Sequence, residues 1–163
     1  MARIFLCYNY FMLKQKPFLF SFLILGILII LHSVGSYYSW YWLYPRFDII
    51  VHVFGGLWVA LLALWLTSIF GRVNSFKNYK LKVFFISFIS AVVIGLLWEL
   101  LENLSQTTFV DSSGYYLNTA LDILGDGLGG VLAFLYFIRR KKITNTNYDV
   151  LHPFYNKTGL INN

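Results

Sequence analysis

Residues 18–34 read FLFSFLILGILIILHSV, an apolar run that contains no Asp, Glu, Lys or Arg. A helix needs roughly 20 mostly apolar residues to cross the hydrocarbon core of a bilayer. Three further runs of this kind follow along the chain, at about 47–70, 83–104 and 118–138. We therefore predict an all-α, polytopic membrane protein, built as a four-transmembrane-helix bundle.

The composition of the 163-residue chain supports a membrane location. Hydrophobic residues make up 58% of the sequence and charged residues only 12%, whereas soluble domains carry about 25% charged residues. The chain has one cysteine, Cys7, so it cannot form an internal disulfide.

The positions of Lys and Arg predict the orientation in the membrane, since cytoplasmic loops are enriched in these residues. Twelve of the thirteen lie before the first helix, between the second and third, or after the fourth; only Arg46 lies elsewhere. We expect a multi-pass protein of the bacterial cytoplasmic (inner) membrane with both termini in the cytoplasm. Residues 1–142 would form a single membrane domain and residues 143–163 a cytoplasmic tail. The net charge of +6 then faces anionic lipid, so we expect membrane lipids as partners and no nucleic acid.

Ionisable side chains are predicted at one level of the bundle, near the outer ends of its helices. At 1.5 Å of rise per residue, the group falls within roughly 10 Å of the outer boundary. Charged groups inside a bilayer are costly and usually mark a functional site. The candidates for binding a metal or another cation are Asp48, His52, Glu99, Glu102, Asp122 and Asp126, with His32, Asn103 and Thr119 as supporting residues.

The spacing of these residues pairs them on helix faces. Asp48 and His52 are four residues apart, as are Asp122 and Asp126, so each pair shares a face. Two carboxylates on adjacent turns repel each other unless a proton or a cation lies between them. A simpler interpretation is that Asp48 and Asp122 favour the positive end of a helix.

Two of the predicted helices share a pattern. Asp48-x-x-x-His52-x-x-Gly-Gly recurs as Asp122-x-x-x-Asp126-x-x-Gly-Gly with the same offsets. We interpret the first and second helices, and the third and fourth, as two parallel helix-pair repeats. Small residues let membrane helices approach closely, and a bundle with such small interfaces could also pair as a homodimer. We expect helix packing at Gly55, Gly56, Gly125, Gly129 and Gly130.

At these motifs the chain resembles the VanZ-like and YjdF-like bacterial membrane proteins, over roughly residues 45–138. Those families share an Asp and a His that open one helix, a Glu near the end of the next outward helix, and an Asp-x-x-x-Asp or Asp-x-x-x-Asn followed by glycines. Glu102 and Asp126 stand where the VanZ pattern has Gln and Asn, so the YjdF-like variant fits better. The resemblance implies a site at these positions and leaves its activity open.

Three kinds of function fit these observations. The acidic site could hold a divalent metal ion such as Mg²⁺, Mn²⁺ or Zn²⁺ and act on, or bind, an envelope lipid or its headgroup. Alternatively, it could bind a proton or cation for transport, or its acids could form interhelical hydrogen bonds in a membrane assembly protein. The sequence contains no phosphate-binding Gly-rich loop, zinc-protease helix or serine nucleophile elbow, and whether the protein is an enzyme stays open.

Overall fold

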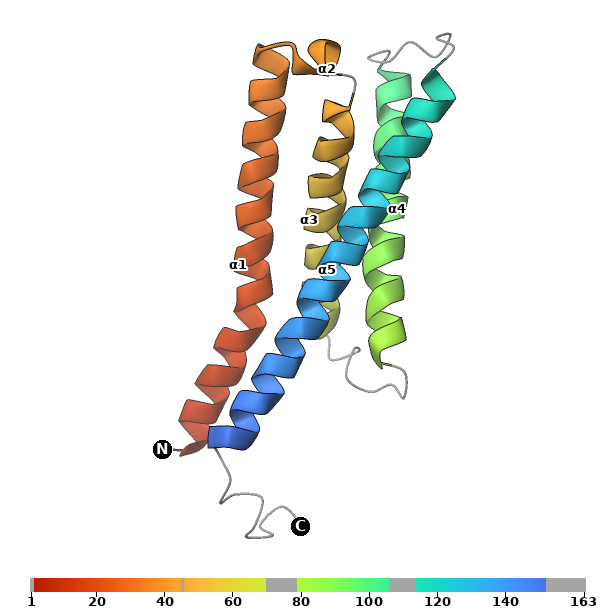
Figure 1. The fold of residues 1–163 in the computed structure, drawn as a ribbon. Coiled ribbons are helices and arrows are strands. Elements are labelled where there is room, and N and C mark those ends of the chain that lie inside the picture. The colour runs from red at the N-terminus through yellow and green to blue at the C-terminus, as the bar shows by residue number, and fades with distance from the viewer. Residues whose placement is uncertain (1, 45, 70–78, 106–113, 152–163) are drawn as a thin grey trace.

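The computed structural model describes residues 2–44, 46–69, 79–105 and 114–151, and the side chains between residues 18 and 140 within those ranges. This part of the chain consists of four long helices and one short helix, and it contains no strand. Figure 1 shows them in order: α1 (Ala2–Tyr37), α2 (Trp40–Leu43), α3 (Phe47–Ile69), α4 (Tyr79–Leu104) and α5 (Tyr115–Leu151).

Each long helix contains a stretch that is long and apolar enough to cross a membrane. These stretches are Phe18–Tyr37, Phe47–Ile69, Tyr79–Leu104 and Tyr115–Arg140. The predicted all-α four-helix membrane bundle is therefore confirmed. The helices extend a few residues beyond three of the predicted spans, because aromatic and charged residues such as Tyr37, Lys80 and Tyr115 continue a helix past the apolar run. Beyond its span, α5 runs on to Leu151, into the predicted tail.

Helix α3 occupies the centre of the bundle, since α1, α4 and α5 all pack against it. Helix α5 crosses α3 obliquely and also packs along α4 (Figure 1). Helix α1 lies mainly against α3, and the stacked rings of Phe20 and Tyr136, 4.6 Å apart, join it to α5. The two helix pairs of the predicted repeat are packed differently. Helix α4 packs against both α3 and α5, whereas α1, its counterpart in the first pair, packs mainly against α3.

Glycines allow α3 and α5 to lie in close contact. A Cβ atom on Gly129 would overlap the Val53 carbonyl and the Leu57 amide, and one on Gly125 would lie 3.1 Å from the Ile49 carbonyl oxygen. The other three predicted packing glycines differ in the atoms that they face. Gly56 lies against the α5 backbone, Gly130 against the Ser87 carbonyl of α4, and Gly55 has only an Asp126 oxygen within reach, at 3.9 Å.

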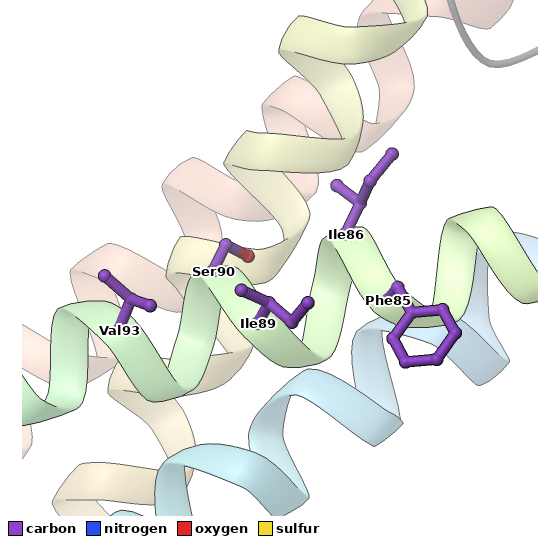
Figure 2. Close-up of a pocket in the computed structure, with 5 residues that line it drawn as sticks. All are labelled: Phe85, Ile86, Ile89, Ser90 and Val93. Carbon is purple, nitrogen blue, oxygen red and sulfur yellow. The ribbon is translucent and has the colours of Figure 1, made fainter.

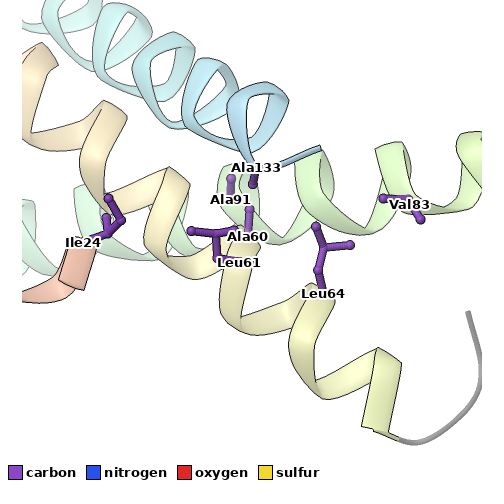
Figure 3. Close-up of a cluster of buried hydrophobic side chains, with 7 residues drawn as sticks. All are labelled: Ile24, Ala60, Leu61, Leu64, Val83, Ala91 and Ala133. Carbon is purple, nitrogen blue, oxygen red and sulfur yellow. The ribbon is translucent and has the colours of Figure 1, made fainter. Parts of the chain in front are cut away.

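The apolar core fills the half of the bundle nearer the N-terminus of α1. Side chains from all four long helices meet there (Figure 3): Ile24, Ala60, Leu61, Leu64, Val83, Ala91 and Ala133. The buried polar side chains described in this half, Ser21 and Ser87, bond to carbonyls of their own helices, and the buried acids lie in the other half.

An exposed side of α4 carries a shallow apolar groove (Figure 2), lined by Phe85, Ile86, Ile89, Ser90 and Val93. None of the candidate site residues contributes to it. Its composition matches that of a helix surface covered by lipid chains.

We predict that Gly129→Ala lowers the free energy of unfolding by roughly 1–3 kcal/mol, the usual result of overpacking. The new methyl group would push against the α3 backbone, which cannot rotate away as a side chain can. The matched control is Gly26→Ala, where nothing lies within 4 Å of the added Cβ. The control should be neutral or stabilising by up to about 1 kcal/mol through helix propensity. Equal stability of the two variants in detergent unfolding would contradict the close α3–α5 contact.

Candidate functional site

The acidic candidates meet at the distal end of the bundle, where α1 ends, α3 begins, α4 ends and α5 begins. Four of them are almost completely buried, with exposed fractions of 6% for His52, 7% for Glu99, 0% for Asp122 and 4% for Asp126. The side chain of Asp48 is 26% exposed and lies at the edge of the group. We call these five residues the distal cluster.

The imidazole of His52 lies at the centre of the distal cluster. Its Nδ1 is 2.9 Å from Oδ2 of Asp126. Its Nε2 is 3.5 Å from Oε1 of Glu99 and 3.9 Å from Oδ1 of Asp48. An ionised carboxylate only accepts hydrogen bonds, so the Asp126 contact favours the neutral tautomer with its proton on Nδ1. In that tautomer the lone pair of Nε2 faces the other carboxylates.

Two carboxylates of the cluster each accept a hydrogen bond at one oxygen and have no hydrogen-bond partner at the other. Glu99 accepts a hydrogen bond at Oε2 from the Thr119 hydroxyl, 3.0 Å away, and Asp122 accepts one at Oδ2 from the Asn118 amide, 2.7 Å away. Oε1 of Glu99 and Oδ1 of Asp122 are buried without a hydrogen-bond partner. Buried polar atoms in proteins are nearly always paired, so each of these two oxygens could accept a bond from a ligand.

The spacing of the donor atoms suits a metal ion. Asp48, His52 and Asp122 each offer one ligand atom, and these atoms all lie within 4.8 Å of one another. Ligands that bind one ion at about 2.0–2.2 Å are at most about 4.4 Å apart. A small inward movement would therefore let the three atoms bind one ion, with the free oxygen of Glu99 close by.

The structure leaves some of the predicted residues outside the distal cluster. Glu102 is half-buried one turn beyond Glu99 and accepts a hydrogen bond from the Trp98 indole, 2.8 Å away. Asn103 is exposed, and among the described contacts it makes none with the cluster. His32 is exposed at the end of α1 and pairs with the Tyr41 hydroxyl at 2.8 Å.

Tyr41, the partner of His32, belongs to the short helix α2 at the distal end. The short helix α2 follows Ser39, which adopts a left-handed conformation with φ of 57° and turns the chain across the distal end. Burial raises the pKa of Tyr41 to about 12, and the negative charges of Asp48 and Glu102 add to the effect. The hydroxyl therefore keeps its proton at physiological pH.

Three residues of the site were not predicted from the sequence. Asn118 and Tyr41 make the contacts above, and Gly95 of α4 lies against the carboxylate of Asp126, whose Cγ would be only 2.6 Å from an added Cβ. The spacing in the sequence could have indicated two of them, since Gly95 precedes Glu99 by four residues and Asn118 precedes Asp122 by four. Residues so spaced share a helix face.

The fold and the distal cluster together define a polytopic membrane protein with a buried acidic and histidine-containing site. The chain belongs to the DUF2238 family, described as predicted membrane protein, whose family model matches residues 1–143. No curated protein and no solved structure matches the chain.

We predict that Thr119→Val destabilises the protein by roughly 1–3 kcal/mol, because it removes the hydroxyl that donates to Glu99 Oε2 and leaves a charged group without that hydrogen bond. Thr67→Val is the matched control. The Thr67 hydroxyl bonds only to carbonyls of its own helix, which keep their backbone partners, so its loss should be close to neutral. Unfolding in detergent measures both changes, and an equally small effect of Thr119→Val would argue against the Glu99 contact.

Proposed function

We propose that this protein binds a divalent metal ion in the distal cluster and uses it to bind the headgroup of an envelope lipid at the outer face of the bacterial cytoplasmic membrane. The observation that carries the proposal is that neighbouring side chains hold the potential metal ligands in place by hydrogen bonds. His52, Glu99 and Asp122 each have one polar atom held by a neighbouring side chain. The second polar atom of Glu99 and of Asp122 is buried without a hydrogen-bond partner. Outer contacts of this kind orient the ligands of metal sites.

The charge of the cluster also favours a cation. Four carboxylates surround one imidazole in the distal cluster, and Glu102 lies one turn away. Carboxylates packed this closely repel one another unless a proton or cation lies between them, and a bilayer raises the cost of unpaired charge. Oxygen donors with one imidazole nitrogen suit Mg²⁺, Mn²⁺ or Zn²⁺.

The predicted topology supports access from outside. Lys and Arg gather at the opposite end of the bundle in the sequence, and the positive-inside tendency then assigns the distal end to the outer face. Exposed aromatic side chains of α2, including Trp42 and Tyr44, suit the headgroup layer. A phosphate oxygen of a lipid headgroup could reach an ion there and complete its coordination. The resemblance to VanZ-like and YjdF-like proteins supports a site at the same residues.

Transport of a cation or proton is less well supported. Directly below the cluster, toward the cytoplasmic end, the contacts between helices are made by apolar side chains such as Ala60, Leu64 and Ala133. Among the described residues of this half, the buried polar side chains are those of Ser21 and Ser87, whose hydroxyls bond to carbonyls of their own helices. Neither offers a charged group to an ion leaving His52. The arrangement is that of a site reached from one side.

The proposal is tested by metal content and metal affinity of the purified protein. The wild-type protein, prepared without chelator, should hold close to one ion per chain by elemental analysis, and added Mn²⁺ or Zn²⁺ should raise its melting temperature after chelator treatment. His52→Ala should abolish both effects. Asp48→Asn is a milder second variant at a more exposed ligand and should weaken binding. Ser90→Ala, in the apolar groove of α4, is the control that should behave as the wild type.

Lipid binding is tested in the same preparations. Retention of phospholipid in detergent, measured by native mass spectrometry, should fall on removal of the ion and should be low in His52→Ala. A wild-type protein that contains no metal and whose melting temperature does not respond to divalent ions would overturn the metal site. Metal binding without any ion-dependent lipid retention would overturn the headgroup part alone.

A further inference from the structure

Asp126 occupies a slot between two helices that is open only because both carry glycine. On the α4 side, a Cβ atom on Gly95 would overlap the Asp126 carboxylate and lie 3.1 Å from its Cβ. On the α3 side, a Cβ atom on Gly56 would lie 2.7 Å from Cα and 2.8 Å from the carbonyl carbon of Asp126. Gly95 therefore leaves room for the side chain of Asp126, and Gly56 leaves room for its backbone.

The slot fixes what the carboxylate of Asp126 can contact. The oxygen that faces Gly95, Oδ2, is also the oxygen that lies 2.9 Å from Nδ1 of His52. Any side chain at residue 95 would push this carboxylate away from the imidazole. The Asp126 residue is 4% exposed, so the surrounding helices enclose its short side chain.

We propose that Asp126 is the positioning residue of His52 rather than a ligand of the ion, and that the Gly56–Gly95 slot holds it in that role. This inference rests on the proposed metal site. The Asp126 contact uses Nδ1 and leaves Nε2 facing the free oxygen of Glu99 and the carboxylate of Asp48. The ligands would then be Nε2 of His52 and oxygens of Asp48, Glu99 and Asp122.

A fixed Nε2 also decides which metals the site prefers. Imidazole nitrogen suits Zn²⁺ and Co²⁺, while Mg²⁺ takes oxygen donors. An ion that uses His52 depends on the orientation of the ring, and an ion that uses only the carboxylates does not. The slot should therefore increase the preference for transition metals over Mg²⁺.

The first experiment compares Co²⁺ and Mg²⁺ affinities of the full-length protein in detergent. Gly95→Ala keeps every ligand and every charge, so it tests orientation alone. We expect it to weaken Co²⁺ binding roughly 10–100-fold, as loss of an outer-shell partner does, to alter the Co²⁺ absorption spectrum, and to change Mg²⁺ affinity far less. Asp126→Asn, which fits the slot and keeps an acceptor oxygen, should retain more Co²⁺ affinity than Asp126→Ala. Gly26→Ala, on open helix surface, is the control and should leave both affinities unchanged.

An equal loss of Co²⁺ and Mg²⁺ affinity in Gly95→Ala would overturn the positioning role, because a general packing defect affects both ions alike. Unchanged Co²⁺ affinity would overturn it as well.

The second experiment needs no metal and tests the slot itself. In the metal-free protein, Gly95→Ala should lower the melting temperature when Asp126 is present and lower it much less when Asp126 is replaced by Ala, or by Ser if that variant fails to fold. Gly56→Ala should lower it in both backgrounds, since its neighbour is the backbone of residue 126. Double-mutant cycles isolate such pairwise coupling. The same penalty for Gly95→Ala in both backgrounds would refute the slot. If no ion binds but the cycle shows this coupling, the metal site fails and the slot stands.

Discussion

The contacts of a single imidazole hold the distal half of the bundle together. His52 reaches from α3 to α5 through Asp126 and to α4 through Glu99. Groups that ionise are costly inside a bilayer and must find partners within the protein. Glycines at positions 56 and 129 let the backbones of α3 and α5 approach closely, and Gly95 leaves room on α4 for the side chain of Asp126. The glycines and the polar residues of the site are therefore parts of one arrangement.

The apolar core and the buried acidic residues lie in opposite halves of the bundle. Apolar side chains from α1, α3, α4 and α5 fill the half near the N-terminus of α1. The distal half gives up part of that apolar packing for buried acids, two of which keep an oxygen without a partner. Unpaired buried acceptors cost stability, and this cost is offset when a ligand binds them. The distal cluster therefore joins three helices and also contains acceptor atoms that a ligand could use.

The sequence predicts the four candidate membrane spans well, and the lateral contacts of the acids poorly. Long apolar runs and a fixed rise per residue determine the level of each side chain in the membrane. Which side chains meet depends on the rotation of each helix, which packing decides. Glu99 and Glu102 are three residues apart, yet only Glu99 turns toward His52. A helix-end preference does not account for Asp122 either, since that residue is fully buried with one oxygen unpaired.

The shared pattern of α3 and α5 acquires a physical meaning from these contacts. The first residues of the two motifs, Asp48 and Asp122, are alike and both belong to the group of potential metal ligands. The second residues, His52 and Asp126, differ and bond directly to each other. Two aspartates at that meeting point would repel, whereas a neutral imidazole can donate its Nδ1–H to an ionised carboxylate in a charge-assisted hydrogen bond. The motif therefore repeats the same residue at Asp48 and Asp122, and it differs at His52 and Asp126, where the two helices contact each other. The same contact leaves His52 with one free nitrogen directed at the cluster.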